Sequence, residues 1–267
     1  MPAIDLARLK TQAARLSDKF GEPQAFVRDL NELLDFYTNR TIRLVQIVQR
    51  LSLPTYRTPT PVLRRIQAEL VPLADTRPVE AIMLVSALWE AGSLESRLLA
   101  ARLLGSIPPA QALSALTRLP EWLAQSTDKE IREALLTDAL ARLRHENPET
   151  LFSILEDWLK APRAALQIWG LRALVPVLRD SHFENLPAVY RILRPAVRAA
   201  GPTTQMDLQA CLAALEQVSP TETIVFLRGI LTDNPAPALL RTMRRILPGF
   251  STRLQSAVRE ILREKGV

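Results

Sequence analysis

The chain has 267 residues, and 48% of them are hydrophobic, which is enough to bury a sizeable core in one elongated domain or two compact ones. Its single cysteine, Cys211, excludes an intramolecular disulfide framework and a cysteine-based zinc site, and we expect this thiol to be buried in the core. The net charge of +6 suits a polyanionic partner, although by itself it accounts only for solubility and non-specific attraction.

Several function classes find no support in the chain. Residues 1–5 lack the basic and apolar regions of a secretory signal, and the longest apolar run, residues 81–89, is too short to span a bilayer. No glycine-rich phosphate loop or dinucleotide motif occurs, and the two histidines, His145 and His182, have no partners at ligand spacing. We therefore expect a cytoplasmic protein with no membrane contact, no cofactor and no metal site.

Prolines mark the points where helices are expected to begin. The chain has 20 prolines and only eight glycines. Proline fits the first turn of a helix, where its missing N–H would have no intrahelical partner. Eleven prolines precede or open a segment with helical hydrophobic period: Pro2, Pro23, Pro61, Pro78, Pro109, Pro148, Pro162, Pro187, Pro202, Pro220 and Pro237. Because strand-like alternation is scarce, the sequence predicts an all-α protein of about a dozen helices, each of roughly 11–18 residues.

The segment from residue 56 to residue 104 has the most distinctive order of elements. After a non-helical crossing at 51–61, a proline-led helix carries apolar residues three and four apart, namely Val62, Leu63, Ile66 and Leu70. A second helical segment ends at the break Ala91-Gly92-Ser93. A third helix opens on Glu95 and Arg97 and continues through Leu98, Leu99, Leu103 and Leu104. These three elements predict successive packed helices.

Repetition along the chain favours a helical array over a bundle. Residues 70–75, with an internal proline and a final aspartate, are echoed by residues 174–180. Helix pairs at 128–145 with 148–160, and at 220–231 with 235–248, recur at the two-helix period of such arrays. Since a helix pair buries its apolar face by stacking on its neighbours, we expect a curved α-solenoid. No linker of Ser/Gly type interrupts it, so we expect one continuous domain over residues 1–267.

The motif order resembles that of the AlkD-like DNA alkylation repair family. An x-P-x-L-R helix at 60–64, the Leu-Trp pair at 88–89 and an E-x-R-x-x-A-x-x-L-L helix at 95–104 carry the resemblance. The resemblance implies a HEAT-like helical repeat fold and duplex DNA as partner. It also implies hydrolysis of the N-glycosidic bond of cationic alkylpurines such as 3-methyladenine and 7-methylguanine. Base flipping is not required in this family.

The resemblance also implies where the site lies. In the family a tryptophan and, one turn later, a catalytic aspartate face the DNA, together with a second tryptophan on a W-x-x-R helix. Trp169 and Arg172 fit the second element. Trp122 is the candidate for the first, but Ser126 stands four residues later and the nearest acid is Asp128. Asp128 is either the catalytic carboxylate, which would stabilise positive charge on the sugar, or an N-cap of the next helix.

Arginines at helical spacing are candidates for contacts with the DNA backbone. We select Arg43, Arg172, Arg194 and Arg244, because phosphate contacts position a duplex without reading its sequence. An alternative function is a non-catalytic scaffold that binds a protein in the concavity of the solenoid. Convergence of these arginines on one surface around Trp169 would favour DNA, and an apolar or mixed surface would favour the scaffold. We expect the protein to be a monomer in either case.

Overall fold

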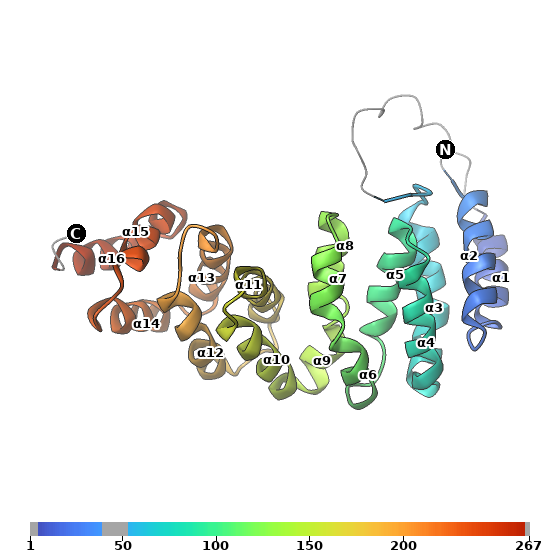
Figure 1. Ribbon diagram of the computed structural model, residues 1–267, viewed down its shortest axis with the longest axis horizontal. Helices are drawn as coiled ribbons and strands as arrows, with labels where there is room; N and C mark the ends of the chain where they lie inside the picture. Colours follow the sequence, from blue (N-terminus) through green and yellow to red (C-terminus); the bar gives the residue numbers. More distant parts are fainter. Residues whose placement is uncertain (1–4, 39–52, 265–267) are drawn as a thin grey trace, which may run out of the picture. The chain divides into compact units, whose positions relative to one another are not determined.

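The computed structural model describes residues 5–38 and 53–264 (Figure 1). All regular structure in these two ranges is helical, with no strand, so the predicted all-α class is confirmed. None of the described helices is long and apolar enough to cross a membrane. The helices divide into two compact units, Met1–Asn147 and Pro148–Val267, which we describe separately. One continuous domain over residues 1–267 stays a prediction.

The first unit stacks its helices in two layers. α1, α3, α5 and α8 contact one another in succession in one layer, and α2, α4 and α6 do so in the other. The short helices α7 and α9 contact α8 and α6 respectively. The bounds are α1 (Leu6–Ser17), α2 (Pro23–Phe36), α3 (Thr60–Thr76), α4 (Pro78–Glu90), α5 (Leu94–Leu104), α6 (Pro109–Leu116), α7 (Leu119–Gln125), α8 (Lys129–Thr137) and α9 (Ala141–Glu146).

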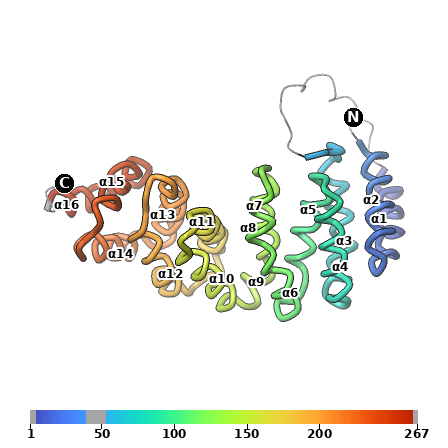
Figure 2. The backbone as a smooth tube through the Cα atoms, in the orientation of Figure 1, coloured from blue at the N-terminus to red at the C-terminus, as the bar shows by residue number. Residues whose placement is uncertain are grey.

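The second unit repeats this arrangement, as the tube in Figure 2 shows for its helices. α11, α13 and α15 form one layer, and α10, α12, α14 and α16 form the other. The bounds are α10 (Pro148–Lys160), α11 (Ala164–Leu178), α12 (Leu186–Arg198), α13 (Gln205–Val218), α14 (Pro220–Thr232), α15 (Pro237–Ile246), the 3-10 helix η2 (Leu247–Gly249) and α16 (Thr252–Glu264).

A fixed spacing of side-chain contacts supports the helical repeat. In the second unit, Arg172 pairs with Asp207, Arg191 with Glu156, Arg198 with Asp233 and Glu216 with Ser251, and each pair is 35 residues apart. Residues at equivalent positions of successive helix pairs contact each other at a constant spacing along the sequence only when each pair stacks on the next one. The predicted helical-repeat solenoid fold is therefore present.

Eight of the eleven predicted prolines open helices, Pro162 and Pro202 shortly precede α11 and α13, and Pro2 lies outside the described residues. Proline occupies the first or second residue of α2, α3, α4, α6, α7, α12, α14 and α15, and α10 starts at Pro148. Pro72 and Pro176, the internal prolines of the two echoed segments, lie inside α3 and α11. The apolar face predicted from Val62 to Leu70 is buried in α3.

One predicted helix is wrong. Residues 128–145 form two helices, α8 and α9, because the chain leaves the helix after Thr137 and restarts at Ala141. The break coincides with a close approach of α5, since a Cβ atom placed on Gly105 would lie 1.8 Å from the carbonyl oxygen of Asp138. This tertiary contact has no signature in the local hydrophobic period, so the sequence alone predicts a single helix across the break.

The acidic residue of the family-like motif ties the non-helical crossing to α5. Glu95 is buried, and its carboxylate accepts hydrogen bonds from Thr55 Oγ1 (2.9 Å), the Tyr56 amide (3.2 Å) and the Thr58 amide (3.3 Å). It lies in the first turn of α5, where the helix dipole favours a negative charge. Glu95 is thus a structural residue of the motif, with all three of its donors supplied by residues 55–58.

Candidate functional site

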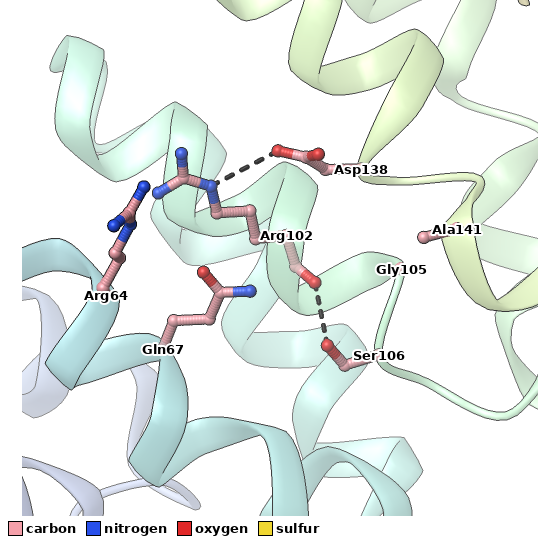
Figure 3. A pocket seen from close by; sticks show the side chains of 7 residues that line it. All are labelled: Arg64, Gln67, Arg102, Gly105, Ser106, Asp138 and Ala141. Atoms are coloured by element: carbon pink, nitrogen blue, oxygen red, sulfur yellow. Dashed lines mark hydrogen bonds and ion pairs between the residues drawn. The ribbon is translucent and has the colours of Figure 1, made fainter. Parts of the chain in front are cut away.

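A polar cleft opens in the first unit where α3, α5 and the turn after α8 meet (Figure 3). Its volume is about 260 Å³. A second hollow of about 240 Å³, lined from α5 and α8, shares Arg102 and Asp138 with it. The cleft is lined by Arg64, Gln67, Arg102, Gly105, Ser106, Asp138 and Ala141. The cleft therefore brings together two guanidinium groups, a carboxylate and a side-chain amide.

The helices that carry the cleft present these side chains because their opposite faces are buried. Arg64 and Gln67 lie one turn apart on α3, while Leu63 and Ile66 of the same helix are buried in the core. Arg102 lies on α5 between the buried residues of its last two turns. Gly105, which has no Cβ atom, lets the turn after α8 approach closely enough to bring Asp138 to the cleft.

Some of the charged and polar groups in the cleft have hydrogen-bond partners within the described ranges, and others have none. Arg102 Nε donates to Asp138 Oδ2 at 3.3 Å, but Arg102 Nη1 is buried and has no hydrogen-bond partner in the described part of the chain. The side chains of Arg64 and Gln67 have neither a hydrogen bond nor an ion pair with any residue that the structure describes. Two arginines and one aspartate leave the lining with a net charge of +1.

The far rim of the cleft is fixed by a further arginine. Arg142 Nη1 donates to the Ser106 carbonyl at 2.9 Å, and the same side chain pairs with Asp75 Oδ1 and with Glu146 Oε1, each at 2.6 Å. These contacts join the loop after α5 to α3 and α9. These bonds hold the rim without using the side chains of Arg64 and Gln67, which therefore remain available for a ligand.

The residues present define the chemistry that this cleft can supply. Asp138 offers a carboxylate whose side chain is 41% exposed, and the arginines offer donors to an anion. Neither hollow is lined by an aromatic side chain. Ala134, one turn before Asp138, stands where the family pattern implies a tryptophan. In residues 5–38 and 53–264 no group of three His, Cys, Asp or Glu side chains that could hold a metal ion is found.

Asp128, the carboxylate selected from the sequence, lies elsewhere. It is the N-cap of α8, and its Oδ1 atom accepts a hydrogen bond from the Glu130 amide at 2.8 Å. The capping alternative is therefore confirmed, and a catalytic role for Asp128 stays a prediction. Asp128 lines neither of the two hollows that contain Asp138.

Trp122 lies inside the first unit instead of on an open face. Only 1% of it is exposed, and its ring stacks on that of Trp89 with centroids 4.5 Å apart and planes 14° apart. Arg97 lies over Trp89 at 4.6 Å and Arg118 over Trp122 at 4.9 Å, so each ring of the stacked pair also has a guanidinium group over it. The predicted core position of Trp89 is confirmed. Trp122 has almost no surface to offer a ligand in this structure.

In the second unit, Trp169 and Arg172 lie on α11 as expected for a W-x-x-R helix. Trp169 is 7% exposed, and Arg172 Nε pairs with Asp207 Oδ1 at 2.6 Å. Arg194 lies on α12, in the other layer, with its guanidinium carbon 5.8 Å from the centre of the Phe226 ring.

Arg244 is exposed near the end of α15, on the layer that also contains α11. The predicted arginines of the second unit thus divide between two layers, with Arg172 and Arg244 on one and Arg194 on the other. Arg43 lies outside the described residues. A role for any of these four residues in contacting DNA stays a prediction.

The sequence reasoning missed the residues that the cleft brings together. Arg64 belongs to the x-P-x-L-R motif, and its exposed position one residue after a buried leucine was the only available signal. Arg102 and Asp138 look like ordinary charges on solvated helix faces. Their shared position follows from the packing of α5 against α8, which no local pattern encodes.

Comparison with known proteins shows the family to which the chain belongs by sequence. The family model for DNA alkylation repair enzymes matches residues 47–219, which is more than half of the chain. The matched span includes the whole lining of the cleft as well as Trp122, Asp128 and Trp169. No curated protein and no solved structure matches the chain.

Proposed function

This chain belongs to the family of DNA alkylation repair enzymes, and on that premise we propose that it binds duplex DNA and hydrolyses the N-glycosidic bond of cationic alkylpurines. The observation that carries the catalytic part is the Asp138 carboxylate in the polar cleft, beside the guanidinium group of Arg102. It replaces Asp128 as the leading candidate because the Asp128 carboxylate is engaged in capping α8.

The chemistry needs a negative group near the sugar. Breaking the bond between C1′ and N9 sends both bonding electrons to the base, so a cationic alkylpurine leaves as a neutral molecule and positive charge develops on the sugar. A carboxylate at this position stabilises that oxocarbenium-like state. Water then adds to C1′ and loses a proton, to the carboxylate or to solvent. Arg102 holds Asp138 in place but also offsets part of its charge, so the stabilisation is smaller than that of a free carboxylate.

Binding of the duplex is proposed on electrostatic grounds. The net charge of +6 attracts a polyanion, and Arg172 and Arg244, which lie on the layer of α11, are candidate phosphate contacts together with Arg43. Arg194 lies on the other layer, so these arginines do not all share one surface, and its contact with a phosphate is proposed separately. In the second unit, Trp169 remains the candidate aromatic residue for a contact with DNA. Because contacts of this kind release counterions, the affinity should fall steeply as salt increases.

A matched pair of substitutions tests the catalytic proposal. Release of free base from a duplex containing 7-methylguanine is measured for the wild type, Asp138→Asn and Asp128→Asn. Asparagine is as good an N-cap as aspartate, so Asp128→Asn keeps α8 capped while making the same chemical change ten residues away. We expect Asp138→Asn to lower the single-turnover rate by roughly 10²-fold, the usual cost of one preorganised charge-stabilising group, and Asp128→Asn to leave it nearly unchanged.

The other outcomes are equally informative. The reverse pattern would make Asp128 the working carboxylate and would remove Asp138 from the mechanism. A wild type that binds duplex DNA in a salt-dependent way without releasing base would be a DNA-binding member that lacks hydrolysis. Absence of duplex binding at low salt, where phosphate-driven affinity is greatest, would reject both parts and favour a scaffold for a protein partner.

A further inference from the structure

We propose that the cleft between α3 and α5 binds one phosphodiester group of the DNA backbone, held by Arg64 and Arg102 next to Asp138. This inference rests on the proposed function and names the part of the DNA that the cleft receives. Neither arginine is among the phosphate contacts selected from the sequence. The cleft would place a backbone phosphate beside the candidate carboxylate.

Arg64 is an exposed cation that lacks a counterion. It lies on α3 and has no ion pair with any residue in the described ranges. Its neighbour Arg65 pairs with Glu69 on the same helix. In Figure 3 the guanidinium groups of Arg64 and Arg102 end on the same side of the cleft. Two like charges there repel one another unless an anion comes between them.

Arg102 also favours an anion in the cleft, because one of its nitrogen donors has no acceptor among the described residues. Nε is used by Asp138, whereas Nη1 is buried without an acceptor in the part of the chain that the structure describes. A buried donor of a charged group is costly to leave unpaired. A phosphate oxygen in the cleft would satisfy it once the Arg102 side chain turns Nη1 toward the opening, and guanidinium groups bind phosphate oxygens through two parallel N–H bonds.

The charge and size of the cleft fit a phosphodiester better than a base. The net charge of the lining, +1, matches the single negative charge of one phosphodiester. The volume of about 260 Å³ has room for the group with several water molecules, each of which takes about 30 Å³ in the liquid. No aromatic side chain is present on which a base could stack. Gln67 adds an amide that can donate to a phosphate oxygen.

The test compares Arg64→Gln with Arg28→Gln. Both variants remove one exposed positive charge from the first unit, but Arg28 lies on α2 in the other layer, pairs with Asp29 and is not part of the lining of the cleft. Affinity for a duplex is measured over a range of salt concentrations. For Arg64→Gln we expect the slope of log affinity against log salt to become shallower by about 0.9, the value for one lost phosphate contact, and for Arg28→Gln we expect no change.

A second measurement identifies the phosphate. A series of duplexes, each with one neutral methylphosphonate linkage, is bound to the wild type and to Arg64→Gln. One linkage should weaken binding of the wild type and have no further effect on Arg64→Gln. If Arg64→Gln and Arg28→Gln keep the same slope while the wild type binds duplex DNA, the phosphate site is refuted and the proposed function stands. If the wild type does not bind duplex DNA at low salt, both are refuted.

Discussion

Replacement of Glu95 should destabilise the first unit, and the loss should be smaller for Glu95→Gln than for Glu95→Ala. In Glu95→Gln the remaining oxygen can still accept from Thr55 and Thr58, but an NH₂ group then faces the Tyr56 amide, which loses its acceptor. One half-buried donor without a partner costs about 1–3 kcal/mol. In Glu95→Ala all three donors lose their acceptor, and because water reaches this half-buried crossing in part, we expect a loss of about 3–5 kcal/mol.

The assay combines a global and a local measurement. Urea unfolding followed by far-UV circular dichroism gives the free energy of unfolding, and hydrogen exchange gives the protection of the Tyr56 and Thr58 amides. In Glu95→Gln we expect Tyr56 to lose protection while Thr58 keeps most of it, and in Glu95→Ala we expect both to lose it. Glu90→Gln, at the exposed end of α4, is the matched control. Unchanged exchange of both amides in Glu95→Ala would refute the reasoning, because it would mean that the carboxylate does not hold the crossing.

Three further predictions follow from burial. Gly105→Ala must displace the Asp138 carbonyl and should cost about 1–3 kcal/mol in urea unfolding, whereas Gly229→Ala, a helical site with open space around it, should add about 0.5–1 kcal/mol; equal effects would contradict the contact. Burial raises the pKa of the Cys211 thiol from 9.0 to about 12. As pH rises, the unfolded chain therefore loses the thiol proton before the folded chain does. The free energy of unfolding should then fall between pH 9 and 12 by up to about 1.4 kcal/mol per pH unit. In Cys211→Ala that part of the slope should vanish, and parallel curves would refute it. Trp122→Ala should cost about 3–5 kcal/mol because the ring is packed on Trp89, and a large loss of duplex affinity with unchanged stability would restore Trp122 as a contact residue.

Local patterns in the chain were sufficient to predict the helices and several of their details. Prolines open the helices, the apolar face from Val62 to Leu70 is buried, and Asp128 caps α8, as the Ser-Thr-Asp sequence suggests. Each of these features depends on residues within one or two turns of each other. The matching order of motifs also led to the correct family, because it is a property of the sequence itself.

The candidate site could not be derived in this way. Arg64, Arg102 and Asp138 come from α3, α5 and the turn after α8, and they meet only because those helices stack on one another in one layer. The break before α9 and the burial of Trp122 against Trp89 are likewise consequences of packing between helices that are distant in the chain. The sequence alone determined which segments are helical and which face of each is apolar, since hydrophobic period and capping act over a few residues. Only the tertiary structure decided which polar side chains share a cleft, because helix packing is set by the shapes of many side chains at once.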